Sequence, residues 1–299
     1  MADALRQRFG EFTISRATTA HAAPFGYYRV EAAQPLFVKV APRERLPHML
    51  AVQTLVVRLV AERCPVQPMQ GEPLQLPGGA VGFVHEYLTE RFADDSVADA
   101  FQVGAALRAI HQALAGAPGA ATAVRLSSQW HRAVAEFPAR DRFAADVAEA
   151  VLSEWSITGE VLDRDRQLIH NDYHRGNVLM GADGVAAVLD FDDAIVSVGS
   201  PLVDLATGLE RFCLADVPDE LSMALAAAFM EGYGRSPAQT SATELRLVAV
   251  ARLLFSLSIL DSSPRPDSQA WQTERRKFVT LIQSWPKWQQ RLIRAGFRP

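Results

Sequence analysis

The stretch LIHNDYHRGNVLM, residues 168–180, gathers polar side chains into one short loop between two apolar ends. Within it Asp172 and Asn177 are five residues apart, and Asp190 follows in the segment VLDFDDA. Carboxylate and amide oxygens are hard ligands that suit Mg²⁺ together with substrate phosphates. An aspartate that precedes such ligands can orient a hydroxyl and accept its proton during phosphoryl transfer. The pattern therefore predicts a site that brings together an alcohol, a magnesium ion and a phosphate chain.

Taken singly, each of these residues has a simpler interpretation, because Asp and Asn commonly turn loops and cap helices. The joint pattern H-x-D-x-x-x-x-N, a strand pair and then D-F-D is a long constraint, and it favours chemistry. His170 and His174 lie four residues apart like zinc ligands, but no third ligand is evident. We expect His170 to hydrogen-bond the loop backbone as a buried structural histidine, and His174 is a further site candidate.

Short apolar strands are predicted on both sides of this loop, at 167–169 and 185–189, with a Gly-Ala-Asp-Gly turn at 181–184. The polar cluster should therefore lie on a loop that strands hold in place.

The two parts of the chain differ in character. Residues 25–41 read as two strands with Lys39 inside the second, residues 48–62 as a helix, and 74–88 as a hairpin with a Pro-Gly-Gly turn. After Leu88 the pattern is mainly helical. The predicted helices span 97–114, 128–155, 202–213, 219–233, 242–260 and 269–294. We expect an α+β protein with a strand-rich part at 1–88 and a helical part at 89–299.

Composition excludes several classes of protein. The formal charge of −4 and a pI near 6.0 provide no basic face for nucleic acid. Cys64 and Cys213 form neither a metal-type pair nor a disulfide framework, which suits a reducing compartment. No signal peptide is visible, and the apolar stretch at 245–260 is short and carries Arg246 and Arg252. We expect a cytoplasmic protein without a membrane span, in which this stretch is a buried helix.

At this point the motifs carry a resemblance to a known family. The chain resembles the aminoglycoside phosphotransferase and choline kinase group, including homoserine-kinase-like members, which have the two-lobed protein-kinase-like fold. The resemblance rests on LFVKV around Lys39, AERCPVQP, FVHEYL, VGAALRAIHQAL, HNDYHRGNVL, VLDFDDA and SPLVDLA. It implies a small antiparallel-sheet lobe with one main helix, joined by a hinge to a larger helical lobe.

The resemblance also implies roles for individual residues. Asp172 would be the catalytic aspartate, Asn177 and Asp190 would hold Mg²⁺, and Lys39 would neutralise the phosphates of ATP, with GTP as the alternative nucleotide. The backbone of the hinge would bind the base, Asp204 would brace the catalytic loop, and two further aspartates would be candidates for contact with metal or substrate. The hinge residues are His85, Glu86, Tyr87 and Leu88, and the further aspartates are Asp192 and Asp193.

Two departures from the family pattern stand out. The partner of the phosphate-binding lysine is normally a glutamate on the following helix, where this chain offers Gln53, or Glu44 before the helix. A neutral amide hydrogen-bonds an ammonium but does not offset its charge. The segment ATTAHAAPFGYY offers only Gly26 where a glycine-richer phosphate-covering loop is expected.

The implied activity is transfer of the γ-phosphate of ATP to a hydroxyl of a small molecule, such as an amino-alcohol, amino acid, aminoglycoside or sugar. Acidic residues near the site favour a cationic acceptor, and the helices after Asp204 should form its wall, with Glu210, Asp216, Glu220 and Glu231 nearby. The alternatives are a Ser/Thr protein kinase of the stress-response type and a nucleotide-binding pseudokinase module. An unrelated magnesium hydrolase is a third.

Overall fold

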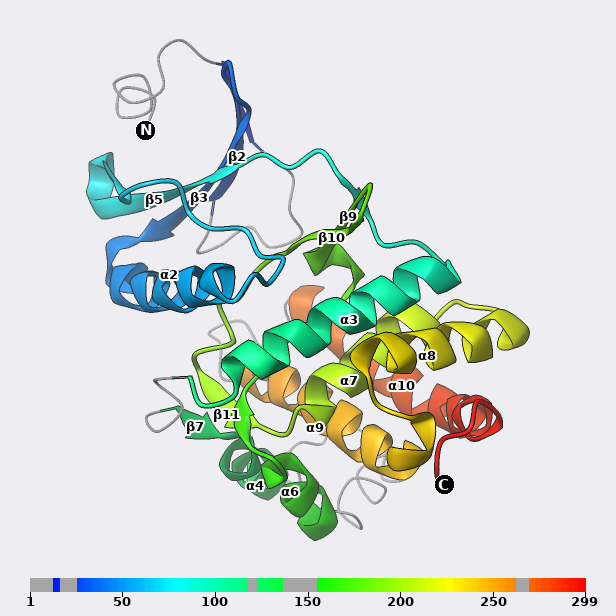
Figure 1. Ribbon diagram of the computed structural model, residues 1–299. Coiled ribbons are helices and arrows are strands. Elements are labelled where there is room, and N and C mark those ends of the chain that lie inside the picture. Colours follow the sequence, from blue (N-terminus) through cyan, green and yellow to red (C-terminus); the bar gives the residue numbers. More distant parts are fainter. Residues whose placement is uncertain (1–12, 17–25, 118–122, 137–154, 262–268) are drawn as a thin grey trace.

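The computed structural model describes residues 13–16, 26–117, 123–136, 155–261 and 269–299, and these form two lobes (Figure 1). The smaller lobe holds an antiparallel sheet and one main helix, and the larger lobe is mainly helical. The prediction of an α+β protein with this division of structure is confirmed. Strand β5 (Ala80–Glu86) is the last strand of the small-lobe sheet along the chain. The predicted boundary between the two parts at residue 88 stays a prediction.

The small-lobe sheet has five strands in the order β1-β2-β3-β5-β4. Besides β5 these are β1 (Thr13–Arg16), β2 (Gly26–Glu31), β3 (Leu36–Pro42) and β4 (Leu74–Leu76). Lys39 lies in the central strand β3, opposite Tyr27 of β2 and Phe83 of β5. Its neighbour Val38 is fully buried on the other face of the sheet, as the alternation of a strand requires. The predicted hairpin over 74–88 is present, with Pro77–Gly79 as its turn.

Helix α2 (Leu46–Ala61) is the predicted helix of the small lobe. Pro47 lies in its first turn, where the missing N–H costs nothing. One face is apolar, and Val52, Leu55, Val56 and Leu59 of that face belong to the large hydrophobic core of the other lobe. The helix therefore connects the two lobes through packing.

The large lobe begins with β6 (Arg91–Phe92) and the long helix α3 (Val97–Leu114). Its other helices are α4 (Leu126–Glu136), α6 (Trp155–Asp163), α7 (Leu202–Gly208), α8 (Asp219–Tyr233), α9 (Ala242–Asp261) and α10 (Gln269–Arg294). The predicted helices at 97–114, 219–233, 242–260 and 269–294 are confirmed. The periodic apolar faces of these segments are long enough to determine the helices locally.

Two helix predictions need correction. The segment 202–213 is helical, but α7 passes at Leu209 into a π-helical turn, Leu209–Leu214, so the hydrogen-bond register changes there. The prediction over 128–155 joins parts of two helices: α4 ends at Glu136, Trp155 begins α6, and residues 137–154 lie outside the described part.

The strands around the loop at 169–177, in which the sequence predicts the catalytic residue, belong to two different small sheets. Strand β8 (Gln167–Leu168) leads into the loop and pairs with β11 (Ser197–Gly199), which also pairs with β7 (Val124–Arg125). Strand β9 (Val178–Gly181) leads out and forms a hairpin with β10 (Gly184–Val188). The strands at 167–169 and 185–189 were correctly located, but they do not share a sheet.

Helices α3 and α8 pack closely against each other through two glycines (Figure 1). A Cβ atom on Gly104 would lie 2.0 Å from the carbonyl oxygen of Phe229, and one on Gly232 would lie 1.9 Å from that of Phe101. This close approach holds His111 of α3 and Tyr233 of α8 within hydrogen-bond distance of each other.

A search of the described helices for an apolar segment of membrane-spanning length finds none.

Candidate active site

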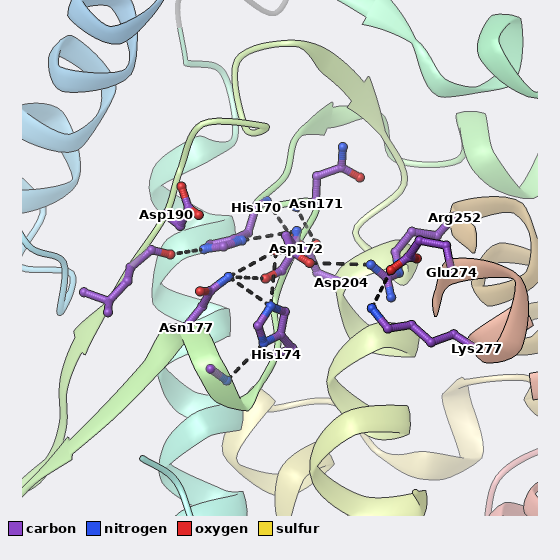
Figure 2. Close-up of polar contacts among 12 residues, drawn as sticks. His170, Asn171, Asp172, His174, Asn177, Asp190, Asp204, Arg252, Glu274 and Lys277 are labelled. Atoms are coloured by element: carbon purple, nitrogen blue, oxygen red, sulfur yellow. Dashed lines mark hydrogen bonds and ion pairs between the residues drawn. The ribbon is translucent and has the colours of Figure 1, made fainter. Parts of the chain in front are cut away.

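Asp172 lies at the centre of a set of polar contacts (Figure 2). One of its carboxylate oxygens is 3.2 Å from His174 Nε2 and accepts a hydrogen bond from Asn177 Nδ2, also at 3.2 Å. The other oxygen lies 3.5 Å from Arg252 Nη1. The side chain of Asp172 is 35% exposed, so its carboxylate is both held by the protein and open to a ligand.

These neighbours determine the charge of Asp172. Burial would raise the pKa of its carboxyl, but the hydrogen bond from His174 and the positive charge of Arg252 outweigh it. The pKa is therefore held well below its ordinary value. At neutral pH Asp172 is a carboxylate and a hydrogen-bond acceptor.

The backbone of the loop is fixed by Asp204, which is fully buried in α7. Its carboxylate accepts hydrogen bonds from the backbone N–H groups of His170 (2.7 Å) and Asn171 (2.8 Å). Asn171 has φ +69°, a left-handed conformation that asparagine tolerates better than most residues. Asp204 thus makes the bracing contacts that the sequence analysis expected of it.

His170 is fully buried, and both of its ring nitrogens form hydrogen bonds with backbone groups. Its Nε2 lies 2.9 Å from the carbonyl oxygen of Leu189, and its Nδ1 accepts from the backbone N–H of Asp172 at 3.3 Å. It links the catalytic loop to the segment before Asp190, as predicted for a structural histidine.

His111 is a supporting residue that the sequence analysis missed. Its Nε2 lies 2.9 Å from the carboxylate of Asp204, and its Nδ1 lies 2.8 Å from the hydroxyl of Tyr233. The motif VGAALRAIHQAL contained this histidine, but its partners come from α7 and α8. Only the folded chain reveals the connection.

Asn177 and Asp190 present the oxygens that a magnesium ion prefers. The Nδ2 of Asn177 donates hydrogen bonds to the backbone carbonyl oxygen of Asp172 at 3.0 Å and to the carboxylate of Asp172. The Oδ1 of Asn177 is therefore the atom left for a cation. Asp190 follows β10 with φ +60°, and its side chain is 45% exposed. An amide oxygen and an accessible carboxylate fit Mg²⁺, which usually takes its remaining ligands from water and phosphates. The described residues contain no cluster of three or more His, Cys, Asp or Glu side chains suited to hold a metal alone.

Lys39 reaches across the lobes to the aspartates of D-F-D. Its Nζ lies 2.8 Å from Asp192 and 3.3 Å from Asp190, and its side chain is only 9% exposed. Burial would lower the pKa of Lys39, but the two carboxylates raise it above its ordinary value. Lys39 is therefore a charged group where β3 faces the large lobe.

The partner expected for Lys39 is Gln53 or Glu44, and the structure places the carboxylates of Asp190 and Asp192 at its ammonium. The amide oxygen of Gln53 accepts a hydrogen bond from the backbone N–H of Met69 at 3.1 Å, and Glu44 lies exposed in a short 3₁₀ turn. Gln53 lies in α2 and Glu44 just before it, so both are close to Lys39 in the sequence. Asp192 is 153 positions from Lys39. The pairing of Gln53 with Lys39 stays a prediction.

The hinge follows β5. The backbone N–H of Tyr87 donates to the carbonyl oxygen of Pro35 at 2.9 Å, and the carbonyl oxygen of Glu86 accepts from the side-chain amide of Gln67. Burial is the main cause that lowers the pKa of His85 to about 4, and the charge of Lys39 adds to it, against a hydrogen bond to the backbone of Pro68. His85 is therefore neutral at pH 7. Base binding by the hinge, including Leu88, stays a prediction.

A cavity of about 1010 Å³ opens beside Asp172. Its wall includes Asp172, His174 and Asp193, together with residues of α4, the π-helical turn, α9 and α10. Partial withdrawal from solvent and the carboxylates of Asp172, Asp190 and Asp192 raise the pKa of Asp193. Elements after Asp204 line this cavity, as does α4, which comes earlier in the chain. That this wall receives the acceptor stays a prediction. Of the four acidic residues named for that wall, Asp216 lines the cavity.

Arg252 is the second residue that the sequence analysis missed. In the sequence it is only a charge that argues against a membrane span. In the structure it projects from α9 toward Asp172, opposite His174 and Asn177 (Figure 2). The available signal was an arginine among the apolar residues in the middle of α9.

Several solved structures share this fold. A thermostable mutant of the aminoglycoside phosphotransferase APH(4)-Ia superposes with a TM-score of 0.66 at 12% identity, over 95% of this chain and 99% of that one. Spectinomycin phosphotransferase APH(9)-Ia superposes with a TM-score of 0.64 at 14% identity, over 95% of this chain and 97% of that one. The macrolide 2'-phosphotransferase of Brachybacterium faecium superposes with a TM-score of 0.62 at 15% identity, over 93% of this chain and 95% of that one. At these identities the likeness establishes the fold, and it confirms the two-lobed protein-kinase-like architecture.

The sequence itself was compared with families and with single proteins. No protein of curated function matches it significantly. The phosphotransferase enzyme family matches residues 23–245, which is well over half of the chain and includes Lys39, the catalytic loop, the D-F-D segment and Asp204. This chain therefore belongs to the phosphotransferase enzyme family.

Proposed function

We propose that the protein is a small-molecule kinase that transfers the γ-phosphate of ATP to a hydroxyl group. The observation that carries this proposal is Asp172: an ionised carboxylate, 35% exposed, on the wall of a cavity of about 1010 Å³. The same loop presents Asn177, and the next one presents Asp190. An acceptor hydroxyl in the cavity would meet a hydrogen-bond acceptor beside the groups suited to phosphates.

In the proposed mechanism Asp172 accepts a hydrogen bond from the acceptor hydroxyl and points its oxygen at the γ-phosphate. Its depressed pKa makes it a weak base, so its main contribution is orientation, and it receives the proton late. This suits phosphoryl transfer through a loose transition state, where little proton removal is needed early. Asp204 and His170 keep the loop rigid while the hydroxyl is positioned.

The phosphate chain would lie between the lobes, near Lys39. The ammonium of Lys39, now paired with Asp190 and Asp192, would exchange part of this pairing for phosphate oxygens. Asn177 and Asp190 would hold Mg²⁺, which when bound neutralises the charge of the phosphates. Asp192 would then remain as the carboxylate partner of Lys39, in place of a glutamate on α2.

Relatives of the same fold support a nucleotide and a small hydroxylated acceptor. Spectinomycin phosphotransferase APH(9)-Ia was solved with ADP and spectinomycin, and a further aminoglycoside phosphotransferase with GDP and kanamycin. Because the second structure contains GDP, GTP stays an alternative phosphate donor in this proposal. The described residues offer no membrane span, and the sequence offers no basic face for nucleic acid.

Thermal unfolding tests the nucleotide site directly. We expect ATP with Mg²⁺ to raise the unfolding midpoint of the wild type, by about 2.7 kcal/mol of stability at a 100-fold excess over Kd. Neither ATP alone nor Mg²⁺ alone should reproduce the shift. Asp190→Asn should lose it, because asparagine tolerates the positive φ of this position but removes the charge.

Asp183→Asn is the matched control, because Asp183 lies exposed in the turn between β9 and β10. It should respond to nucleotide like the wild type. Absence of any shift at millimolar ATP and GTP would contradict the proposal. A shift without turnover on any acceptor would favour the pseudokinase alternative.

A further inference from the structure

The cavity beside Asp172 carries as many permanent cations as carboxylates. The cations on its wall are Arg132, Arg175, Arg211, Arg252 and Lys277. The carboxylates are Asp95, Asp172, Asp193, Asp216 and Glu274. This balance differs from the acidic site that the sequence analysis expected for a cationic acceptor. The acidic residues expected from the sequence lie between Glu210 and Glu231. Most of the cations come instead from α4, α9 and α10, and the sequence does not place these side chains near the site.

Most of these cations already have partners. Arg175 is ion-paired with Asp95 and donates to two backbone carbonyl oxygens, Arg211 lies 3.3 Å from Glu210, and Lys277 lies 2.5 Å from Glu274. These pairs consume much of the hydrogen-bonding capacity of the wall. They shape the cavity without leaving a strong site for an anion.

Arg252 is different. Its side chain is 12% exposed, and its Nη1 lies 3.5 Å from Asp172 Oδ1, longer than a good charged hydrogen bond. Its Nε is buried and has no hydrogen-bond partner within the described part of the chain. A buried donor without a partner costs about 1–3 kcal/mol. A guanidinium presents its donors as a planar fork that matches a carboxylate with two hydrogen bonds.

We propose that Arg252 binds a carboxylate of the acceptor, so that the substrate is a hydroxyl-bearing carboxylic acid. This inference rests on the proposed function and specifies its acceptor. Because Arg252 contacts Asp172, the acceptor's carboxylate and its reacting hydroxyl are separated by only a few bonds. The cavity of about 1010 Å³ leaves room for a larger body beyond them.

Arg252 favours an anionic group over a cationic one. A polycation would place its charges near the guanidinium of Arg252, which has donors only. A single carboxylate can accept from this guanidinium where it lines the cavity, beside the long contact with Asp172.

Matched acceptor pairs test the inference: serine, glycerate and 3-hydroxybutyrate, each against its carboxamide. We expect the acids to be phosphorylated with at least a tenfold higher kcat/KM than the amides. Arg252→Gln should lower kcat/KM for the acids roughly 10- to 100-fold, the equivalent of one charge-assisted hydrogen bond, mainly through KM. Because Arg252 also contacts Asp172, kcat can fall for acids and amides alike, so the readout is the ratio of their kcat/KM values, which should approach one in this variant.

Arg246→Gln is the matched control, because Arg246 lies on the same helix, α9, and does not line the cavity. It should keep the acid preference. Equal use of acids and amides by the wild type, or an acid preference that survives in Arg252→Gln, would overturn the inference. Transfer to a cationic acceptor such as kanamycin, with none to the acids, would overturn it and leave the proposed kinase function intact.

A binding measurement keeps the inference testable where turnover is slow. With a non-hydrolysable ATP analogue and Mg²⁺ present, each acid should raise the unfolding midpoint of the wild type and of Arg246→Gln but not of Arg252→Gln. No stabilisation by any of the acids, or equal stabilisation by acids and amides, would overturn it. Loss of the analogue's own stabilising effect would instead overturn the nucleotide site of the proposed function.

Discussion

Asp204→Asn should damage both stability and catalysis, although Asp204 touches no ligand. Its carboxylate accepts three hydrogen bonds, from the backbone N–H groups of His170 and Asn171 and from the side chain of His111. Asparagine has one acceptor oxygen, and its amide group would point at least one N–H toward another N–H donor. The residue is fully buried, so water cannot take the place of the lost acceptor.

The cost follows from these contacts. One lost hydrogen bond to a charged acceptor is worth about 1.5–3 kcal/mol, and the buried N–H that it leaves unpaired costs about 1–3 kcal/mol. We expect a loss of about 3–5 kcal/mol, the range seen when one member of a buried charged pair is removed. Catalysis should fall through kcat, because the loop that carries Asp172 is no longer held.

Urea denaturation of wild type, Asp204→Asn and the surface variant Asp183→Asn measures this loss. The free energy of unfolding should fall in Asp204→Asn and stay within about 0.5 kcal/mol of the wild type in Asp183→Asn, as for an ordinary surface substitution. A change below 1 kcal/mol in Asp204→Asn, with kcat unaltered, would refute the reasoning that Asp204 braces the loop.

Two further changes test the packing and the hinge. Gly104→Ala should destabilise by about 1–3 kcal/mol in urea denaturation, because its Cβ would lie 2.0 Å from the backbone oxygen of Phe229 and overpack α3 against α8. Gly159→Ala, whose Cβ would meet only the side chains of His131 and Trp130, should be tolerated, and equal effects of the two would contradict the close contact. His85 has a folded pKa of about 4 against an ordinary 6.5, so the unfolded state binds more protons between these values and stability falls as pH drops from 6.5 to 4. The loss attributable to His85 is at most about 3 kcal/mol. It should be absent from the pH profile of His85→Gln, and identical profiles of the two proteins would show that burial does not perturb this histidine.

The part of the site that lies in one stretch of sequence was predictable. Asp172, Asn177 and His170 share one loop, and their spacing already fixes that they meet. The long helices were predictable for the same reason, since their apolar periodicity is local. The pairing of β8 with β11 was not, because strands of two or three residues show no periodicity and pair through tertiary contacts.

The contacts that sequence reasoning missed join residues far apart along the chain. Asp192 reaches Lys39 across 153 positions, and His111 reaches Asp204 across 93. Arg252 reaches Asp172 only because α9 packs behind the catalytic loop. Such pairings depend on which helix faces join in the core, and a single sequence does not encode them as a readable pattern.

The most direct test of the central claim is transfer of labelled γ-phosphate from ATP to hydroxylated acceptors by wild type and Asp172→Asn. We predict Mg²⁺-dependent transfer by the wild type and a loss of about 10²–10⁴-fold in Asp172→Asn, the range for removal of a group that accepts a proton in the reaction. Nucleotide-dependent thermal stabilisation should persist in this variant, because the proposed role of Asp172 is to contact the acceptor and not the nucleotide. Equal transfer by the two proteins would contradict the assignment of Asp172 as the catalytic residue.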